Sequence, residues 1–269
     1  MVNKIYKISA GIATFLVFYF VSLYSVQDSL LFYPDKKYVS PFNAGVSDFK
    51  EYPIVMPDGQ MVMSWFAKGN PNKPIIVFFH GNAGQIATFA PMMEAYHQDG
   101  YSVLMPEYRG FASTGGKRTE DTMLADAIWT YDYVKQKLGY NKIVAYGYSM
   151  GAGVASGLSQ YRMLDGLILA APFSSLQALV KEKRVPFATW ILKTKFRSDK
   201  VLSTFMAPTL IIHGKNDKLI PPHHGEKLFD ILSSSDKTLE LLAGQNHYDL
   251  FFDKQNHKRV RDWLDERYY

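Results

Sequence analysis

The feature that most constrains this chain is the sequence Gly147-Tyr148-Ser149-Met150-Gly151, which follows the apolar run 143–146 and precedes a stretch of small residues. Glycines on both sides of a serine allow a strand-to-helix turn so tight that side chains there would clash. The serine is then held on a strained turn with its hydroxyl exposed above a sheet. The bare pattern arises by chance in many proteins, but its strand–turn–helix context is specific. We therefore predict that Ser149 is a nucleophile.

Short apolar runs alternate with helical patterns along most of the chain. Runs that are apolar on both faces are typical of central strands in a covered parallel sheet. The pattern predicts an α/β fold, with an N-terminal hairpin around Pro57-Asp58-Gly59 and a mostly parallel sheet that carries helices on both faces. The expected strands are 52–56, 61–66, 75–79, 102–105, 143–146, 167–170, 209–213 and 238–242, and the expected helices are 86–98, 122–138, 151–160, 222–232 and 249–266.

A serine hydroxyl needs a base, and the base needs a carboxylate that orients it. Asp217 follows run 209–213 and His247 follows run 238–242, so both are expected at the sheet edge that carries Ser149. The order serine, acid, histidine is the one this architecture uses. Asp249 and Asp253 are the alternatives for the acid. The other histidines fit less well: His80 and His213 end strands and are expected to brace loops, His223 and His224 begin a helix, and His97 and His257 lie on helical surfaces.

Acyl transfer also needs hydrogen-bond donors for a developing oxyanion. The backbone N–H of Met150, next to the predicted nucleophile, is one candidate. The loop His80-Gly81-Asn82-Ala83-Gly84 after run 75–79 offers the N–H of Asn82 as the other. The alternative is a glycine-rich turn without a catalytic role. Asp126 is expected to support the loop 108–114 rather than to take part in chemistry.

The N-terminal segment predicts a membrane anchor. Lys4 and Lys7 precede residues 8–26, a run without charge that is long enough to cross a hydrocarbon core of about 30 Å as a helix. A cleaved signal peptide and a buried core helix are the alternatives, but the run lacks an Ala-x-Ala-like site at its far end. The expected organisation is an anchor (1–28) followed by a catalytic domain (29–269). The two lysines favour a single-pass topology with the catalytic domain on the non-cytoplasmic side, although Lys36 and Lys37 make the asymmetry slight.

Composition narrows the classes of function. The chain has no cysteine, which excludes disulfides, thiolate metal sites and cysteine nucleophiles. A net charge of +5 over 269 residues gives no reason to expect a nucleic-acid partner. The predicted chemistry needs no cofactor and no metal, and the sequence does not define the oligomeric state. Aromatic residues in Leu30-Leu31-Phe32-Tyr33-Pro34 fit either a lipid–water interface or packing on the domain.

A small cap is expected at residues 172–206, the one long excursion between strands. Its segment 181–200 is basic and contains Phe187, Trp190 and Ile191 at helical spacing. One reading is a surface that docks on anionic lipid headgroups, with its aromatic residues controlling entry to the pocket. The other is an ordinary lid with solvated lysines. The basic residues of the segment are Lys181, Lys183, Arg184, Lys193, Lys195, Arg197 and Lys200.

Taken together these motifs resemble the α/β-hydrolase superfamily and, more narrowly, the membrane-anchored ABHD subfamily of serine hydrolases. The resemblance covers most of residues 28–252 and includes Tyr108-Arg109-Gly110-Phe111, Ala171-Pro172-Phe173 and His213-Gly214-Lys215-Asn216-Asp217. Ala112 departs from the pattern, because relatives tend to have glycine there. The resemblance implies hydrolysis of ester or thioester bonds in acyl or lipid-like substrates.

Two rival functions remain open at this point. The first is an aminopeptidase-like amide hydrolase with the same three residues, for which Glu107 is the candidate to bind the substrate amine. The second is a non-catalytic membrane scaffold. A scaffold of this type usually lacks one of the catalytic residues, and none is missing here.

Overall fold

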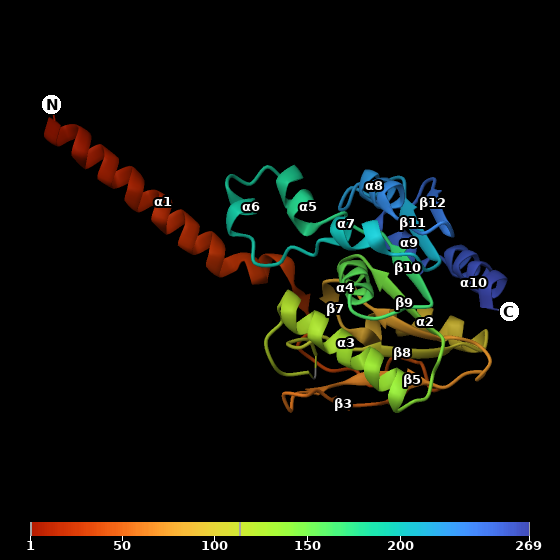
Figure 1. The fold of residues 1–269 in the computed structure, drawn as a ribbon. Helices are drawn as coiled ribbons and strands as arrows, with labels where there is room; N and C mark the ends of the chain where they lie inside the picture. The colour runs from red at the N-terminus through yellow and green to blue at the C-terminus, as the bar shows by residue number, and fades with distance from the viewer. Residues whose placement is uncertain (1, 113, 269) are drawn as a thin grey trace.

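The computed structural model describes residues 2–112 and 114–268. Its centre is an eight-stranded sheet of order β12-β11-β10-β9-β6-β8-β5-β2 (Figure 1). The strands from β12 to β8 run parallel, whereas β5 and β2 are antiparallel to their neighbours. The bounds are β2 Lys50–Glu51, β5 Ser64–Ala67, β6 Ile75–Phe79, β8 Ser102–Pro106, β9 Ile143–Tyr148, β10 Gly166–Ala170, β11 Thr209–Gly214 and β12 Lys237–Leu242. The prediction of a mostly parallel sheet is confirmed.

Alternating side chains of the central strands divide the core between two faces. In β6, Ile75, Val77 and Phe79 belong to one buried cluster, and Ile76 and Phe78 belong to the other. Helices α3 (Glu120–Gln136), α4 (Met150–Ser159) and α8 (His223–Ile231) supply the first cluster, while α2 (Ile86–Gln98) and α10 (Lys254–Tyr268) supply the second. Both faces of the sheet are therefore covered, which explains why its central strands contain few polar residues.

The single helix expected over residues 249–266 is wrong. Two helices occupy this region, α9 (His247–Phe252) and α10, separated by Asp253 in an extended conformation. The Asp253 carboxylate accepts hydrogen bonds from the Gln245 side chain and from the backbone N–H of Gln255. Asp253 thus satisfies a free donor at the start of α10, as an N-cap residue does.

The hairpin expected around Pro57-Asp58-Gly59 is present, but it is short and separate from the main sheet. Strands β3 (Ile54–Val55) and β4 (Met61–Val62) pair in antiparallel fashion. The chain then enters β5, which joins the main sheet beside β8.

Helix α1 (Val2–Leu31) is longer than the predicted anchor and projects from the body as a single rod (Figure 1). Residues Tyr6–Leu31 form a helix long and apolar enough to cross a membrane. No residue of its 18-residue apolar stretch is buried against the rest of the protein. Beyond the helix, β1 (Tyr33–Pro34) pairs in parallel with β7 (Ala83–Gly84). The two aromatic residues here differ in their surroundings. Phe32 is buried and packs on the domain, whereas Tyr33 is exposed, as an interfacial residue would be.

The segment 172–206 forms an excursion of short helices between β10 and β11. These are α5 (Leu176–Glu182), α6 (Ala188–Ile191), α7 (Ser198–Val201) and the 3₁₀ turn η1 (Leu202–Thr204). The helical spacing inferred for Phe187, Trp190 and Ile191 is wrong at its first residue, because Phe187 has a left-handed backbone (φ 57°) and precedes α6. In Figure 1, α6 lies beside the second half of α1.

Candidate active site

Ser149 occupies the sharp turn between β9 and α4 that the sequence predicts. Its backbone is strained, with φ 55° and ψ −114°, in a region that few non-glycine residues adopt. A Cβ on Gly147 would lie 2.3 Å from the carbonyl oxygen of Gly151, and a Cβ on Gly151 would lie 1.9 Å from that of Phe79. Both glycines are therefore required for α4 to start this close to the sheet.

The structure brings Ser149, His247 and Asp217 together in one hydrogen-bonded chain. His247 Nε2 lies 3.1 Å from Ser149 Oγ, and His247 Nδ1 lies 2.6 Å from Asp217 Oδ2. The three side chains come from loops at the carboxyl ends of β9, β11 and β12. The carboxylate fixes the proton on Nδ1, which leaves Nε2 as the acceptor for the serine proton. The hydroxyl of Tyr148 donates to the backbone carbonyl of His247 at 3.0 Å and helps to position it.

Asp217 is held as a carboxylate although it is buried. Its Oδ1 accepts the backbone N–H groups of Leu219 and Ile220 at 2.9 and 2.8 Å. Burial alone raises the pKa of Asp217, but hydrogen bonds from His213, His247 and the Ile220 amide outweigh it and hold this pKa well below its ordinary value. Asp249 and Asp253, the alternative acids, instead lie at the N-termini of α9 and α10.

His213 is a buried neighbour of Asp217. Its ring is fully buried, and its Nε2 lies 2.8 Å from the carbonyl oxygen of Ile220 and 3.4 Å from Asp217 Oδ2. It therefore braces the loop that carries Asp217. This agrees with the expectation that His213 braces a loop rather than acts as the base.

Glu107 does not serve as a group for a substrate amine. It is 2% exposed, and its two oxygens accept hydrogen bonds from His80 Nε2 at 2.7 Å and from the backbone N–H groups of Tyr108 and Ile86. These hydrogen bonds link Glu107 to both ends of the loop that follows β6. Both carboxylate oxygens are therefore already engaged, which argues against the considered role of Glu107 in binding a substrate amine.

The residues that carry the two predicted oxyanion donors, Met150 and Asn82, both line the cavity that opens beside Ser149. Met150 is the first residue of α4, so its N–H has no acceptor within the helix. Among residues 2–112 and 114–268, the N–H of Asn82 likewise has no acceptor. The Asn82 side chain donates to the Leu31 carbonyl at 2.7 Å, and the backbone carbonyl of Asn82 accepts the N–H of Tyr33 at 2.8 Å. The end of α1 thus holds this loop in place.

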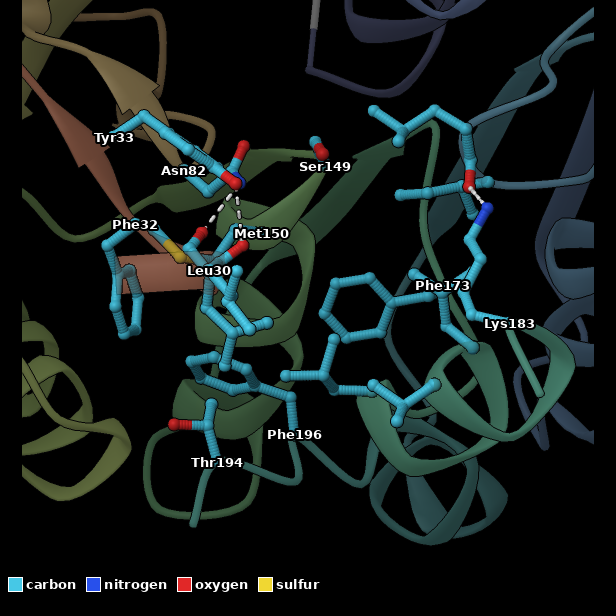
Figure 2. A pocket seen from close by; sticks show the side chains of 16 residues that line it. Leu30, Phe32, Tyr33, Asn82, Ser149, Met150, Phe173, Lys183, Thr194 and Phe196 are labelled. Atoms are coloured by element: carbon cyan, nitrogen blue, oxygen red, sulfur yellow. Dashed lines mark hydrogen bonds between the residues drawn. The ribbon is translucent and has the colours of Figure 1, made fainter. Parts of the chain in front are cut away.

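A cavity of about 290 Å³ opens beside Ser149 (Figure 2). Its wall is mostly apolar and comes from three parts of the chain: the end of α1, the loop after β11 and the segment 172–206. Lys183 is the charged residue among its described lining residues, and its Nζ donates to the Leu219 carbonyl at 3.3 Å. The apolar lining residues include Leu30, Leu31, Phe32, Phe173, Leu176, Leu179, Val180, Phe196, Leu219 and Ile220.

Two supporting predictions concern the loop 108–114. Asp126 accepts two hydrogen bonds from Arg109, at 2.8 and 2.6 Å, and so supports the loop as expected. Ala112 has φ 41°, a backbone conformation that favours glycine. Glycine, which the resemblance leads us to expect at this position, is the residue that this backbone prefers, so alanine here is strained.

A comparison with protein-family models matches residues 70–204 and 197–255 to the serine aminopeptidase family S33. The chain belongs to this family. Solved structures agree on the fold: the esterase Pf2001 of Pyrococcus furiosus superimposes with a TM-score of 0.72 at 18% identity, over 89% of this chain and 100% of that one. The predicted α/β-hydrolase fold is therefore confirmed.

Curated relatives support the narrower ABHD resemblance. Human protein ABHD12B is 30% identical over 188 residues, which cover 62% of this chain and 52% of that protein. The lysophosphatidylserine lipase ABHD12 of Danio rerio is 27% identical over 264 residues, covering 86% of this chain and 69% of the relative. The chain thus spans about half of the first relative and somewhat more of the second.

Proposed function

We propose that this family member hydrolyses carboxylic ester or thioester bonds of long-chain acyl substrates through a Ser149–His247–Asp217 triad. The observation that carries the proposal is that the hydrogen-bonded chain of these residues ends at a mostly apolar cavity. An apolar cavity with few polar groups favours binding of an acyl chain.

The geometry supports the usual two-step acyl transfer. Ser149 Oγ attacks the acyl carbonyl carbon while His247 Nε2 takes the hydroxyl proton, and the backbone N–H groups of Met150 and Asn82 stabilise the oxyanion. The tetrahedral intermediate collapses, the leaving alcohol or thiol takes the proton from His247, and an acyl-enzyme remains. Water attacks this ester with His247 again as base, which releases the acid and restores Ser149.

Lysophospholipids are the substrate class that we favour. The Danio rerio relative is named for hydrolysis of lysophosphatidylserine, and the cavity combines an apolar wall with a cation, Lys183, at its lining. A single acyl chain fits the wall, and a phosphate in the leaving group suits an ammonium. The amide-hydrolysis alternative lost its candidate residue when Glu107 was found buried and engaged.

The division into an anchor at 1–28 and a catalytic domain at 29–269 with a cap near 172–206 is also a proposal, as is the single-pass topology with the catalytic domain outside the cytoplasm. It rests on the length and apolar surface of α1 and on Lys4 and Lys7 at its start. Protease accessibility of the catalytic domain in sealed, inside-out vesicles tests the topology. Full protection of the domain is expected, and cleavage of it would reverse the assignment.

Fluorophosphonate labelling tests the nucleophile. Wild type should be labelled, whereas Ser149→Ala should not, and Ser159→Ala, a serine at the far end of α4, serves as the matched control. Persistent labelling of Ser149→Ala would refute the assignment. A panel of p-nitrophenyl esters of increasing chain length and of lysophospholipids, assayed with the same variants, then defines the acyl and headgroup preference.

A further inference from the structure

Helix α1 packs against the segment that connects α5 to α7, through both apolar and polar contacts. The rings of Phe20 and Phe187 lie 5.8 Å apart, and the hydroxyl of Tyr19 donates to the carbonyl of Pro186 at 2.9 Å. Nearer the body, the buried side chain of Gln27 donates to the Ile191 carbonyl and accepts the N–H of Lys193 at 2.8 Å. Residues 184–191, called the tip below, are therefore fixed beside the second half of α1 (Figure 1).

The register of these contacts places the tip within the depth that a bilayer occupies around α1. A hydrocarbon core takes about 20 helical residues, so a core that begins after Lys7 ends near Gln27. Phe20 then lies about 10 Å inside the core, at a rise of 1.5 Å per residue. The hydrocarbon core can also begin as early as Lys4, if the side chains of Lys4 and Lys7 extend to the far membrane surface. In that case the core still extends past Phe20 along the helix. The tip contacts Tyr19 and Phe20, so it enters the same layer.

The chemistry of the tip fits that layer. Trp190 is 77% exposed, and Val185 and Phe187 are also exposed, although none of the three lines the cavity beside Ser149. Phe187 and Trp190 are therefore not walls of the cavity, and control of pocket entry by them stays a prediction. Nothing on the described body covers these side chains, and they continue the exposed apolar surface of α1.

Several backbone groups of the tip are paired, which favours insertion because each free polar group is costly in lipid. The N–H groups of Ala188 and Trp190 donate to carbonyls within the tip, and that of Arg184 donates to the carbonyl of Lys181. Residue 186 is a proline and has no N–H. The carbonyls of Pro186 and Ile191 accept hydrogen bonds from side chains of α1.

Polar and charged groups lie at the base of the tip, where a headgroup layer is expected. Lys193 Nζ lies 3.8 Å from Asp28 Oδ2 and 4.2 Å from the centre of the Tyr24 ring. Lys181 and Arg184 are exposed on the other side of the tip. Cations beside exposed aromatic residues are complementary to anionic lipid headgroups.

We propose that the tip inserts into the bilayer that α1 spans, and that the cavity takes its acyl substrate directly from that layer. Leu30 and Leu31 of α1 and Leu179 and Val180 of α5 line the cavity, so the two elements that lead to the bilayer both form part of its wall. This inference rests on the proposed function for its substrate, but the insertion of the tip is tested independently of hydrolysis.

Insertion is tested by fluorescence quenching with the full chain in vesicles of phosphatidylcholine and phosphatidylglycerol brominated at mid-acyl positions. The signal of Trp190 is obtained as the difference between wild type and Trp190→Phe. It should be largely lost in brominated vesicles relative to unbrominated ones. Trp129, which is 37% exposed on α3, provides the matched control through Trp129→Phe, and its signal should not change. Equal Trp190 emission in the two kinds of vesicle would overturn insertion of the tip.

Entry from the bilayer is tested by comparing two substrates in those vesicles. A charge in the acyl layer is strongly disfavoured, so Trp190→Asp should lower hydrolysis of a vesicle-embedded lysophospholipid by about tenfold or more. Hydrolysis of water-soluble p-nitrophenyl acetate should stay at the wild-type rate. Met163→Asp, an exposed apolar position remote from α1, should change neither rate. Equal retention of both activities in Trp190→Asp would overturn entry from the bilayer. Absence of both activities in wild type would instead refute the proposed function, while the quenching result would still stand.

Discussion

The side-chain amide of Asn82 donates a 2.7 Å hydrogen bond to the backbone carbonyl of Leu31, the last residue of α1. The backbone N–H of the same asparagine is the proposed oxyanion donor. A predicted membrane helix and a predicted catalytic loop therefore meet at one residue. The parallel pairing of β1 with β7 extends this link by two residues on each side.

The first prediction concerns this link. Asn82→Ala keeps the backbone donor but removes the bond that orients it. Complete loss of an oxyanion donor costs roughly 10²–10³ in kcat, so a misplaced donor should cost less, about tenfold. KM should change little, because the effect is on the transition state. Steady-state kinetics on a soluble p-nitrophenyl ester measure both. The exposed Asn72→Ala is the control, and an unchanged kcat in Asn82→Ala would show that the bond does not orient the donor.

A second prediction concerns the turn at Ser149. In Gly151→Ala the new Cβ would meet the backbone carbonyl of Phe79 at 1.9 Å, and backbone atoms cannot move aside as a flexible side chain can. Such overpacking should cost about 3 kcal/mol or more in the free energy of unfolding. Denaturant titration checks this, with Gly115→Ala as control, because its nearest neighbour is a side-chain atom at 3.6 Å. Similar stability of the two variants would contradict the packing argument.

Features that depend on neighbouring residues were predictable from the sequence. The serine turn is specified by two glycines within four residues of one another, and each parallel strand is a short run that is apolar on both faces. Asp217 and His247 followed from the same reasoning, because parallel strands bring their carboxyl ends to one edge. The hydrogen bonds that join Ser149, His247 and Asp217 could be established only from the structure.

Features that depend on contacts distant in sequence were not predictable. The engagement of Glu107, for example, depends on His80, 27 residues away. The packing of Phe20 on Phe187 joins positions 167 apart, as does the bond from Tyr19 to Pro186. No periodicity in the chain encodes such pairings, so the role of α1 as a wall of the cavity was missed.

The depressed pKa of Asp217 gives a third prediction, on acid stability. A carboxyl group whose pKa is lower in the folded state stabilises the fold above its unfolded pKa, about 3.9, and this contribution is lost as pH falls toward the folded pKa. The stability difference between wild type and Asp217→Asn should therefore shrink as pH is lowered from 5 to 2.5. Unfolding titrations over that range measure it. A difference that grows on acidification would contradict the direction of the shift.

A fourth prediction concerns the headgroup. Lys183→Ala should raise KM for an anionic lysophospholipid by up to about fivefold, the value of a partly exposed charge pair of roughly 1 kcal/mol. KM for a neutral monoacyl ester of equal chain length should be unchanged. Lys181→Ala removes a neighbouring exposed lysine that does not line the cavity, and it serves as the control. Equal effects of the two variants would indicate a general surface attraction rather than a contact with the substrate.

The last prediction separates the anchor from the cavity wall. Deletion of residues 2–26 removes the part of α1 that leaves the body but keeps Gln27, the Leu31 carbonyl and the β1–β7 pairing. Activity on a soluble short-chain ester should then survive. Deletion of residues 2–34 also removes Leu30, Leu31 and Phe32 from the cavity and the hydrogen-bond acceptor from Asn82. This shorter chain should lose most of that activity, while circular dichroism reports whether the sheet remains folded. If both truncated proteins are folded and equally active, α1 is a tether alone. If the first is folded and active and the second is folded but inactive, the end of the membrane helix is part of the active site.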